Sequence, residues 1–136
     1  MPGIVVGYDG TDSAKGALDA AVEFANDLDE PLLAVFGYGT NPIGGEVKDH
    51  VQALKEYGEK VTAEAVENAG KAGAKAEAVL ADEEGAEALT AVAEDRDARM
   101  IVVGSRGEGP IRGAILGATA YRLVHISDTP VLVVRV

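Results

Sequence analysis

Cysteine and tryptophan are absent from this 136-residue sequence, and aromatic residues make up only 4% of it. The absence of cysteine excludes disulfides, thiol catalysis and zinc–thiolate centres. Because aromatic rings are so few, the core has to be built from valine, isoleucine, leucine and alanine. In a chain that is 47% hydrophobic, such a core favours the α/β class, with aliphatic strands covered by alanine-rich helices. The length suits one compact domain over residues 1–136.

Histidine and positive charge are also scarce. His50 and His125 lie far apart, and neither belongs to a metal-binding motif, so both are interpreted as surface or helix-end residues. Acidic residues outnumber basic ones by 23 to 12, which gives a formal net charge of −11. Such a charge disfavours binding to nucleic acids or to anionic membranes. Acids scattered along the whole chain also suggest, as a hypothesis, a protein that stays soluble at high salt.

Long apolar runs are missing as well. No stretch is long enough to cross a bilayer. The first residues, MPGIVVGYDG, have neither the basic region nor the cleavage site of a signal peptide. We therefore expect a cytoplasmic protein that does not associate with a membrane.

The sequence does contain a regular alternation of short apolar runs and helical patterns. Runs typical of strands cover residues 4–8, 31–38, 74–81, 98–104 and 129–136. Helical patterns lie between them at residues 14–25, 47–72, 83–95 and 118–127. Thr11 or Asp12 is expected to cap the first helix, and the third strand is expected nearer a sheet edge. This alternation predicts a doubly wound, five-stranded parallel sheet, because every crossover can then be right-handed.

Ligands of doubly wound sheets bind beyond the carboxyl ends of the strands, where the chain order reverses. Here the ends of the first strand, at Asp9, and of the fourth, at Gly104, are the natural candidates. The segment GSRGEGPIRGAILGAT, residues 104–119, follows the fourth strand and contains five glycines. It is either a tight connection or a loop whose N–H groups hold a phosphate. It has no lysine, which excludes a Walker A loop, and the dinucleotide fingerprint does not follow the first strand.

Three of these glycines, Gly104, Gly107 and Gly117, have the spacing G-x2-G-x9-G. This spacing resembles that of the nucleotide-binding members of the universal stress protein family. The stretches IVVGYDGTDSAKGAL, MIVVGSRG and TPVLVVRV also fall where that family places them, so the resemblance covers the whole chain. It implies a Rossmann-like fold of the adenine nucleotide alpha hydrolase-like type, with strand order 3-2-1-4-5. It also implies an adenine nucleotide, ATP or AMP, between the first and fourth strands.

The resemblance assigns roles to individual residues. Asp9 matches the family's acidic residue beside the ribose and phosphates, and Val35 matches the residue whose backbone meets the adenine edge. Gly104 and Gly107 match the glycines that let the backbone approach the phosphates. Gly117 opens the helix whose N–H groups receive them, and a helix N-terminus attracts anions through its partial positive charge.

Asp9 has two interpretations. Its carboxylate could bind ribose hydroxyls, or hold a Mg²⁺ ion against a phosphate. Alternatively, it could form an Asx-turn that serves only the start of the helix. Arg106 and Arg112 also have two interpretations, because a guanidinium suits phosphate oxygens but could equally neutralise acids such as Glu108.

One position departs from the family pattern, because Ala118 stands where ATP-binding members have Ser or Thr. Loss of one hydrogen bond to a charged group costs about 1.5 to 3 kcal/mol. Thr119 follows one position later, about 100° further round the helix, so it could cap the first turn or contact a shifted phosphate. This departure could move the preference from ATP toward AMP.

Three functions remain open. The chain could be an adenine-nucleotide-binding regulator of the stress response, a dimeric interaction module of the same family without a nucleotide, or an enzyme. Neither Ser105 nor Ser127 has a histidine and an orienting acid fixed by the sequence, so the resemblance implies at most slow ATP hydrolysis or autophosphorylation. The final strand, TPVLVVRV, has apolar residues at both its odd and its even positions, so both faces are apolar. It could be an ordinary buried strand or the edge that forms a homodimer. The resemblance implies the antiparallel dimer.

Overall fold

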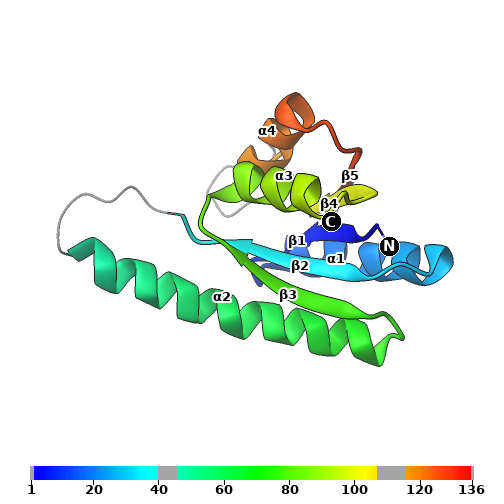
Figure 1. Cartoon of the computed structure of the whole chain (residues 1–136), viewed down its shortest axis with the longest axis horizontal. Coiled ribbons are helices and arrows are strands. Elements are labelled where there is room, and N and C mark those ends of the chain that lie inside the picture. Colours follow the sequence, from blue (N-terminus) through cyan, green and yellow to red (C-terminus); the bar gives the residue numbers. More distant parts are fainter. Residues whose placement is uncertain (1, 40–45, 107–115, 136) are drawn as a thin grey trace.

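The structure is a computed structural model that describes residues 2–39, 46–106 and 116–135, without the side chains of residues 46–48. Within these residues, strands and helices alternate strictly along the chain (Figure 1). The strands are β1 (Ile4–Gly7), β2 (Leu32–Gly37), β3 (Ala76–Ala81), β4 (Met100–Gly104) and β5 (Val131–Val134). The helices are α1 (Asp12–Leu28), α2 (Glu46–Lys71), α3 (Gly85–Asp95) and α4 (Ala118–Ile126).

The five strands form one parallel sheet in the order β3-β2-β1-β4-β5. This order confirms the predicted fold class and places β3 at an edge, as expected. The order reverses direction at β1, because the chain moves outward through β2 to β3 and then returns to β4 on the other side. Figure 1 shows α1 and α2 on one face of the sheet and α3 and α4 on the other.

The hydrophobic core lies on both faces of the sheet. Side chains alternate along a strand, so Ile4 and Val6 pack toward α1 and α2, whereas Val5 packs toward α3 and α4. All three are fully buried, like Leu32 and Ile101 on the neighbouring strands. This two-sided burial explains why the three central strands β1, β2 and β4 are continuous aliphatic runs rather than alternating ones.

The ends of α1 show which local signals decide helix boundaries. Thr11 is the N-cap, and its Oγ1 accepts a hydrogen bond from the N–H of Ala14 at 3.2 Å. Of the two predicted caps, Thr11 is therefore correct. The helix continues to Leu28, past the last apolar residue of the predicted pattern, and stops at Asp29, whose φ of 53° is left-handed. No glycine marks this C-terminus, so the sequence gives no glycine signal for where the helix ends.

An ion pair lies at the amino ends of the strands, away from the ligand-binding edge of the sheet. Glu30 is only 8% exposed, and its Oε1 accepts hydrogen bonds from both Nε and Nη2 of Arg99, the first at 2.7 Å. The hydrogen bond from Arg99 holds the pKa of the Glu30 carboxyl below its usual value.

In the described ranges, no helix has the length and apolar character needed to cross a membrane.

Candidate functional site

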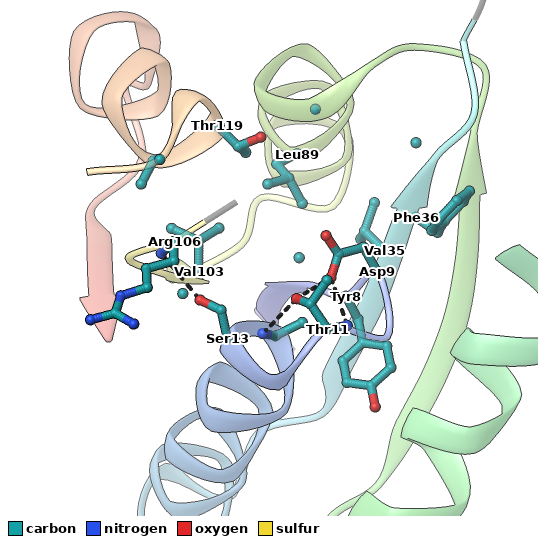
Figure 2. Close-up of a pocket in the computed structure, with 17 residues that line it drawn as sticks. Tyr8, Asp9, Thr11, Ser13, Val35, Phe36, Leu89, Val103, Arg106 and Thr119 are labelled. Carbon is teal, nitrogen blue, oxygen red and sulfur yellow. Dashed lines mark hydrogen bonds between the residues drawn. The ribbon is translucent and has the colours of Figure 1, made fainter. Parts of the chain in front are cut away.

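A cavity of about 240 Å³ opens at the carboxyl ends of β1, β2 and β4, where the strand order reverses (Figure 2). Its volume lies close to the lower end, about 300 Å³, of typical small-ligand sites. One part of its wall is apolar and is formed by Val35, Phe36, Leu89, Val103 and Ala120. The polar part is formed by Asp9, Thr11, Ser13, Arg106 and Thr119.

Most of the site residues that the sequence predicted meet at this cavity. Those that line it are Asp9, Val35, Gly104, Arg106, Gly117 and Thr119. Ala118 is exposed and does not line it. Gly107 and Arg112 lie outside the described residues, so their predicted roles stay predictions. The location of the cavity agrees with the crevice between the first and fourth strands that the sequence indicated.

Asp9 combines a structural contact with an accessible oxygen. Its Oδ1 accepts hydrogen bonds from the N–H of Thr11 at 3.0 Å and from Thr11 Oγ1 at 2.6 Å. This is the Asx-turn that the sequence left open, and it anchors the start of α1. Figure 2 shows the carboxylate reaching into the cavity, on the side that faces Leu89. One oxygen therefore serves the fold, and the other is available to a ligand.

Val35 contributes a side chain to the apolar wall and a carbonyl to the sheet. The N–H of Tyr8 donates to this carbonyl at 3.0 Å, which is one rung past the end of β1. The ring of Tyr8 points away from the cavity (Figure 2) and is buried among residues of α1 and α2. Burial raises the pKa of the Tyr8 hydroxyl. An adenine edge that meets the Val35 backbone at this carbonyl, as the sequence predicts, would therefore share it with the N–H of Tyr8.

The end of β4 packs against the first turn of α1. The Oγ of Ser13 accepts a hydrogen bond from the N–H of Arg106 at 3.2 Å. A Cβ at Gly104 would lie 2.0 Å from Ser13 Oγ and 2.6 Å from the Ser13 carbonyl oxygen. The close approach of Ser13 therefore requires a glycine at position 104 for packing, apart from the ligand-binding role that the sequence predicts. The guanidinium of Arg106 points away from Asp9 and Thr119 (Figure 2).

The N-terminus of α4 supplies the donor side of the cavity. Gly117 is the N-cap, its N–H donates to the Ser105 carbonyl at 2.6 Å, and, having no side chain, it cannot itself cap the helix. The first N–H groups of a helix have no partner within the helix, so those of residues 118–120 can receive an anion. Thr119 is half-buried against the cavity. Its Oγ1 would be 3.3 Å from a Cβ at Gly85, so the start of α3 lies against that of α4.

The described residues do not form a metal site of their own. Within residues 2–39, 46–106 and 116–135, no group of three or more acidic or histidine side chains could hold a metal ion. Asp9 offers a single uncommitted carboxylate oxygen, whereas Mg²⁺ requires six oxygen ligands in near-octahedral geometry. The Mg²⁺ ion that the sequence left open, held between the Asp9 carboxylate and a phosphate, would therefore need a nucleotide to complete its ligands, and it stays a prediction.

The family model described as the Universal stress protein family matches residues 2–135. This chain belongs to that family. A universal stress protein of Thermus aquaticus is 35% identical to it over 135 residues, which are 97% of each chain. The crystal structure of a universal stress protein in complex with cAMP has a TM-score of 0.74 and 28% identity, and covers 98% of this chain and 96% of its own. The universal stress protein of Archaeoglobus fulgidus in complex with dAMP has a TM-score of 0.77 and 25% identity, and covers 98% of each chain.

Several cavity residues of this universal stress protein were not predicted from the sequence. Ser13 and Thr11 lie in the first turn after β1, so their place at the carboxyl edge of the sheet could have been inferred from the strand assignment. Leu89 and Gly85 come from α3, which follows the edge strand β3. The sequence argument considered only the switch point between β1 and β4. It therefore missed the apolar wall that α3 adds.

Proposed function

We propose that this universal stress protein binds an adenine nucleotide in the cavity at the carboxyl ends of β1, β2 and β4, and acts as a nucleotide-responsive regulator. The observation that carries the proposal is the pairing of two features across one cavity. A carboxylate oxygen of Asp9 faces an apolar wall on one side, and the start of α4, whose N-cap Gly117 has no side chain, lies on the other. The complexes of relatives with cAMP and dAMP support an adenine mononucleotide as the ligand.

Each part of the cavity suits one part of such a ligand. The apolar wall that includes Val35, Phe36 and Leu89 suits a purine base. Asp9 can accept hydrogen bonds from ribose hydroxyls without any metal ion. The N–H groups at the start of α4 suit a phosphate, because the helix dipole and the unpaired donors act in the same direction. A Mg²⁺ ion would bind only with oxygen ligands that the nucleotide brings, and no step of the proposed function depends on one.

Isothermal titration calorimetry of the purified chain with AMP, ADP and ATP tests the proposal. Mass spectrometry of small molecules released from the protein identifies any ligand that co-purifies. We expect binding of AMP, weakened about twofold to tenfold by Thr119→Val, because this variant removes one hydroxyl from the cavity. The matched control is Thr90→Val, the same substitution at a half-buried residue of α3 that does not line the described cavity, and it should leave affinity unchanged.

Absence of any adenine nucleotide in both measurements would contradict the proposal. It would favour the interaction module that the sequence left open, in which the surface rather than the cavity carries the function. Hydrolysis of ATP is not part of the proposed function, which is binding alone.

We also propose a homodimer formed through β5, and the exposure of this strand and of the neighbouring helix supports it. β5 is an edge strand, and all four of its residues are only partly buried. On α4, which precedes it, Tyr121, Val124 and Ile126 are 59%, 51% and 38% exposed. An unpaired strand edge beside exposed apolar side chains favours pairing with a second copy of the chain.

A further inference from the structure

Tyr57 contacts the cavity residues from outside the cavity. No residue of α2 within the described ranges lines the cavity. Nevertheless, the hydroxyl of Tyr57, in the middle of α2, donates a hydrogen bond to the backbone carbonyl of Asp9 at 2.9 Å. Its ring meets Phe36, which does line the cavity, edge-on with centroids 5.8 Å apart and planes at 64°. One side chain of α2 therefore contacts both the proposed ribose-binding residue and the apolar wall.

The turn after β1 is shaped around this hydroxyl. Gly10 has φ of +84°, a conformation that residues with a side chain rarely adopt. A Cβ on Gly10 would lie 2.9 Å from the Tyr57 hydroxyl oxygen and 3.1 Å from Val61 Cγ1. The turn therefore lies directly against α2. Any other residue at this position would strain the backbone and push the Tyr57 hydroxyl away from Asp9.

Asp9 is consequently held at two points. Thr11 holds the carboxylate through Oδ1, and Tyr57 holds the backbone through the carbonyl. With Oδ1 and the backbone both fixed, the direction of the remaining carboxylate oxygen is also fixed. If either contact is lost, the turn gains freedom, and an ordered ligand contact then has to offset more conformational entropy.

We propose that Tyr57 is a positioning residue of the nucleotide site, which aims the free oxygen of Asp9 at the ribose hydroxyls. This inference rests on the proposed function and deepens it. This role has a specific consequence. The contribution of Tyr57 to nucleotide affinity depends on the ribose hydroxyls that donate hydrogen bonds to Asp9. A residue that only supports the fold would affect every ligand of the cavity equally.

The test is a titration of two proteins with two ligands. Wild type and Tyr57→Phe are each titrated by calorimetry with AMP and with 2′,3′-dideoxy-AMP, which lacks both ribose hydroxyls. Tyr57→Phe keeps the ring against Phe36 and removes only the hydroxyl, which lies on a side chain that is 45% exposed. We expect AMP affinity to fall about twofold to tenfold, because binding then has to re-order the turn that the lost hydrogen bond has freed. Affinity for the dideoxy analogue should not change.

Two controls sharpen the measurement. Tyr121→Phe removes a tyrosine hydroxyl on α4, from a side chain that is 59% exposed and does not line the cavity, and should change neither affinity. In an Asp9→Ala background, Tyr57→Phe should have no further effect on AMP, because the residue that it positions is gone. Thermal unfolding of each variant without ligand shows that the fold is retained.

Each outcome decides the proposal. Loss of affinity for AMP alone supports it. Equal losses for AMP and for the dideoxy analogue, or no loss for either, overturn it and leave the nucleotide site intact. Additive effects of Tyr57→Phe and Asp9→Ala also overturn it. Wild type that binds neither ligand overturns the proposed function itself, and the role of Tyr57 with it, before any variant is measured.

Discussion

Replacement of Gly104 by alanine should destabilise the protein strongly, because the site of the new methyl group is already occupied. The Cβ would lie 2.0 Å from Ser13 Oγ and 2.6 Å from the Ser13 carbonyl oxygen. The Oγ can rotate away, but only by giving up its hydrogen bond from the N–H of Arg106. The carbonyl belongs to the backbone of α1 and cannot move without a shift of the helix relative to β4.

The magnitude follows from these two contacts. Overpacking of a filled site costs about 1 to 3 kcal/mol, and loss of the hydrogen bond to Ser13 adds about 0.5 to 1.5 kcal/mol. We therefore expect Gly104→Ala to lower the free energy of unfolding by roughly 2 to 4 kcal/mol. For a chain of this length, that corresponds to a fall in Tm of roughly 10 °C.

Urea unfolding followed by circular dichroism, and calorimetric melting, would measure this change. The control is Gly70→Ala on α2, where a Cβ meets nothing within 4 Å. Alanine there should be neutral or stabilise by up to about 1 kcal/mol. Addition of Ser13→Ala to Gly104→Ala removes the Oγ contact and leaves the carbonyl contact, so the double variant should remain less stable than Ser13→Ala alone. Equal stabilities of Gly104→Ala and Gly70→Ala would refute the packing argument.

Two further predictions concern other parts of the molecule. The hydrogen bond from Arg99 lowers the pKa of the Glu30 carboxyl in the folded protein. The ionised carboxylate therefore stabilises the fold at pH values above its ordinary pKa of about 4.5. This stabilisation is lost as the pH falls through the lowered pKa of the folded state. Glu30→Gln should therefore unfold more easily than wild type at pH 7 and approach it in melts at acidic pH; a gap that is the same at both would contradict this. For the dimer, sedimentation velocity should show a dimer that Val124→Glu on α4 dissociates and Ala53→Glu on the exposed side of α2 does not. A monomeric wild type would refute the β5 interface.

The fold could be predicted from the sequence because its signals are local. The spacing of apolar residues marked each strand and helix, and the alternation predicted a parallel sheet, whereas the strand order 3-2-1-4-5 came from the family resemblance. The contacts that shape the cavity join distant residues and could not be predicted in this way. Ser13 meets Gly104, and Tyr57 meets Asp9 across 48 positions. Periodicity shows that α2 has a buried face but does not show which hydroxyl reaches the turn after β1.

The helix that begins at residue 118 illustrates the same limit at smaller scale. The family spacing directs attention to Ala118, where a hydroxyl is missing. In the structure this side chain is exposed, whereas Thr119 lines the cavity. Successive helical residues differ by about 100° in direction, so a shift of one position decides whether a side chain meets the ligand. The motif fixes where the helix begins, and the packing of α4 against α3 fixes how it is rotated.

The charges of the molecule bear on which nucleotide the cavity prefers. Arg96, Arg99 and Arg122 pair with Glu77, Glu30 and Glu87, and none of these residues lines the cavity. Attraction for an anion therefore comes from the backbone N–H groups at the start of α4 and from Arg106, the one cationic side chain in the described lining, while Asp9 and a formal net charge of −11 oppose it. Each further phosphate adds negative charge against that field, and the guanidinium of Arg106 points away from Asp9 and Thr119 in the described part of the cavity (Figure 2). The balance favours a monophosphate, so AMP should bind at least as tightly as ATP in the same titration.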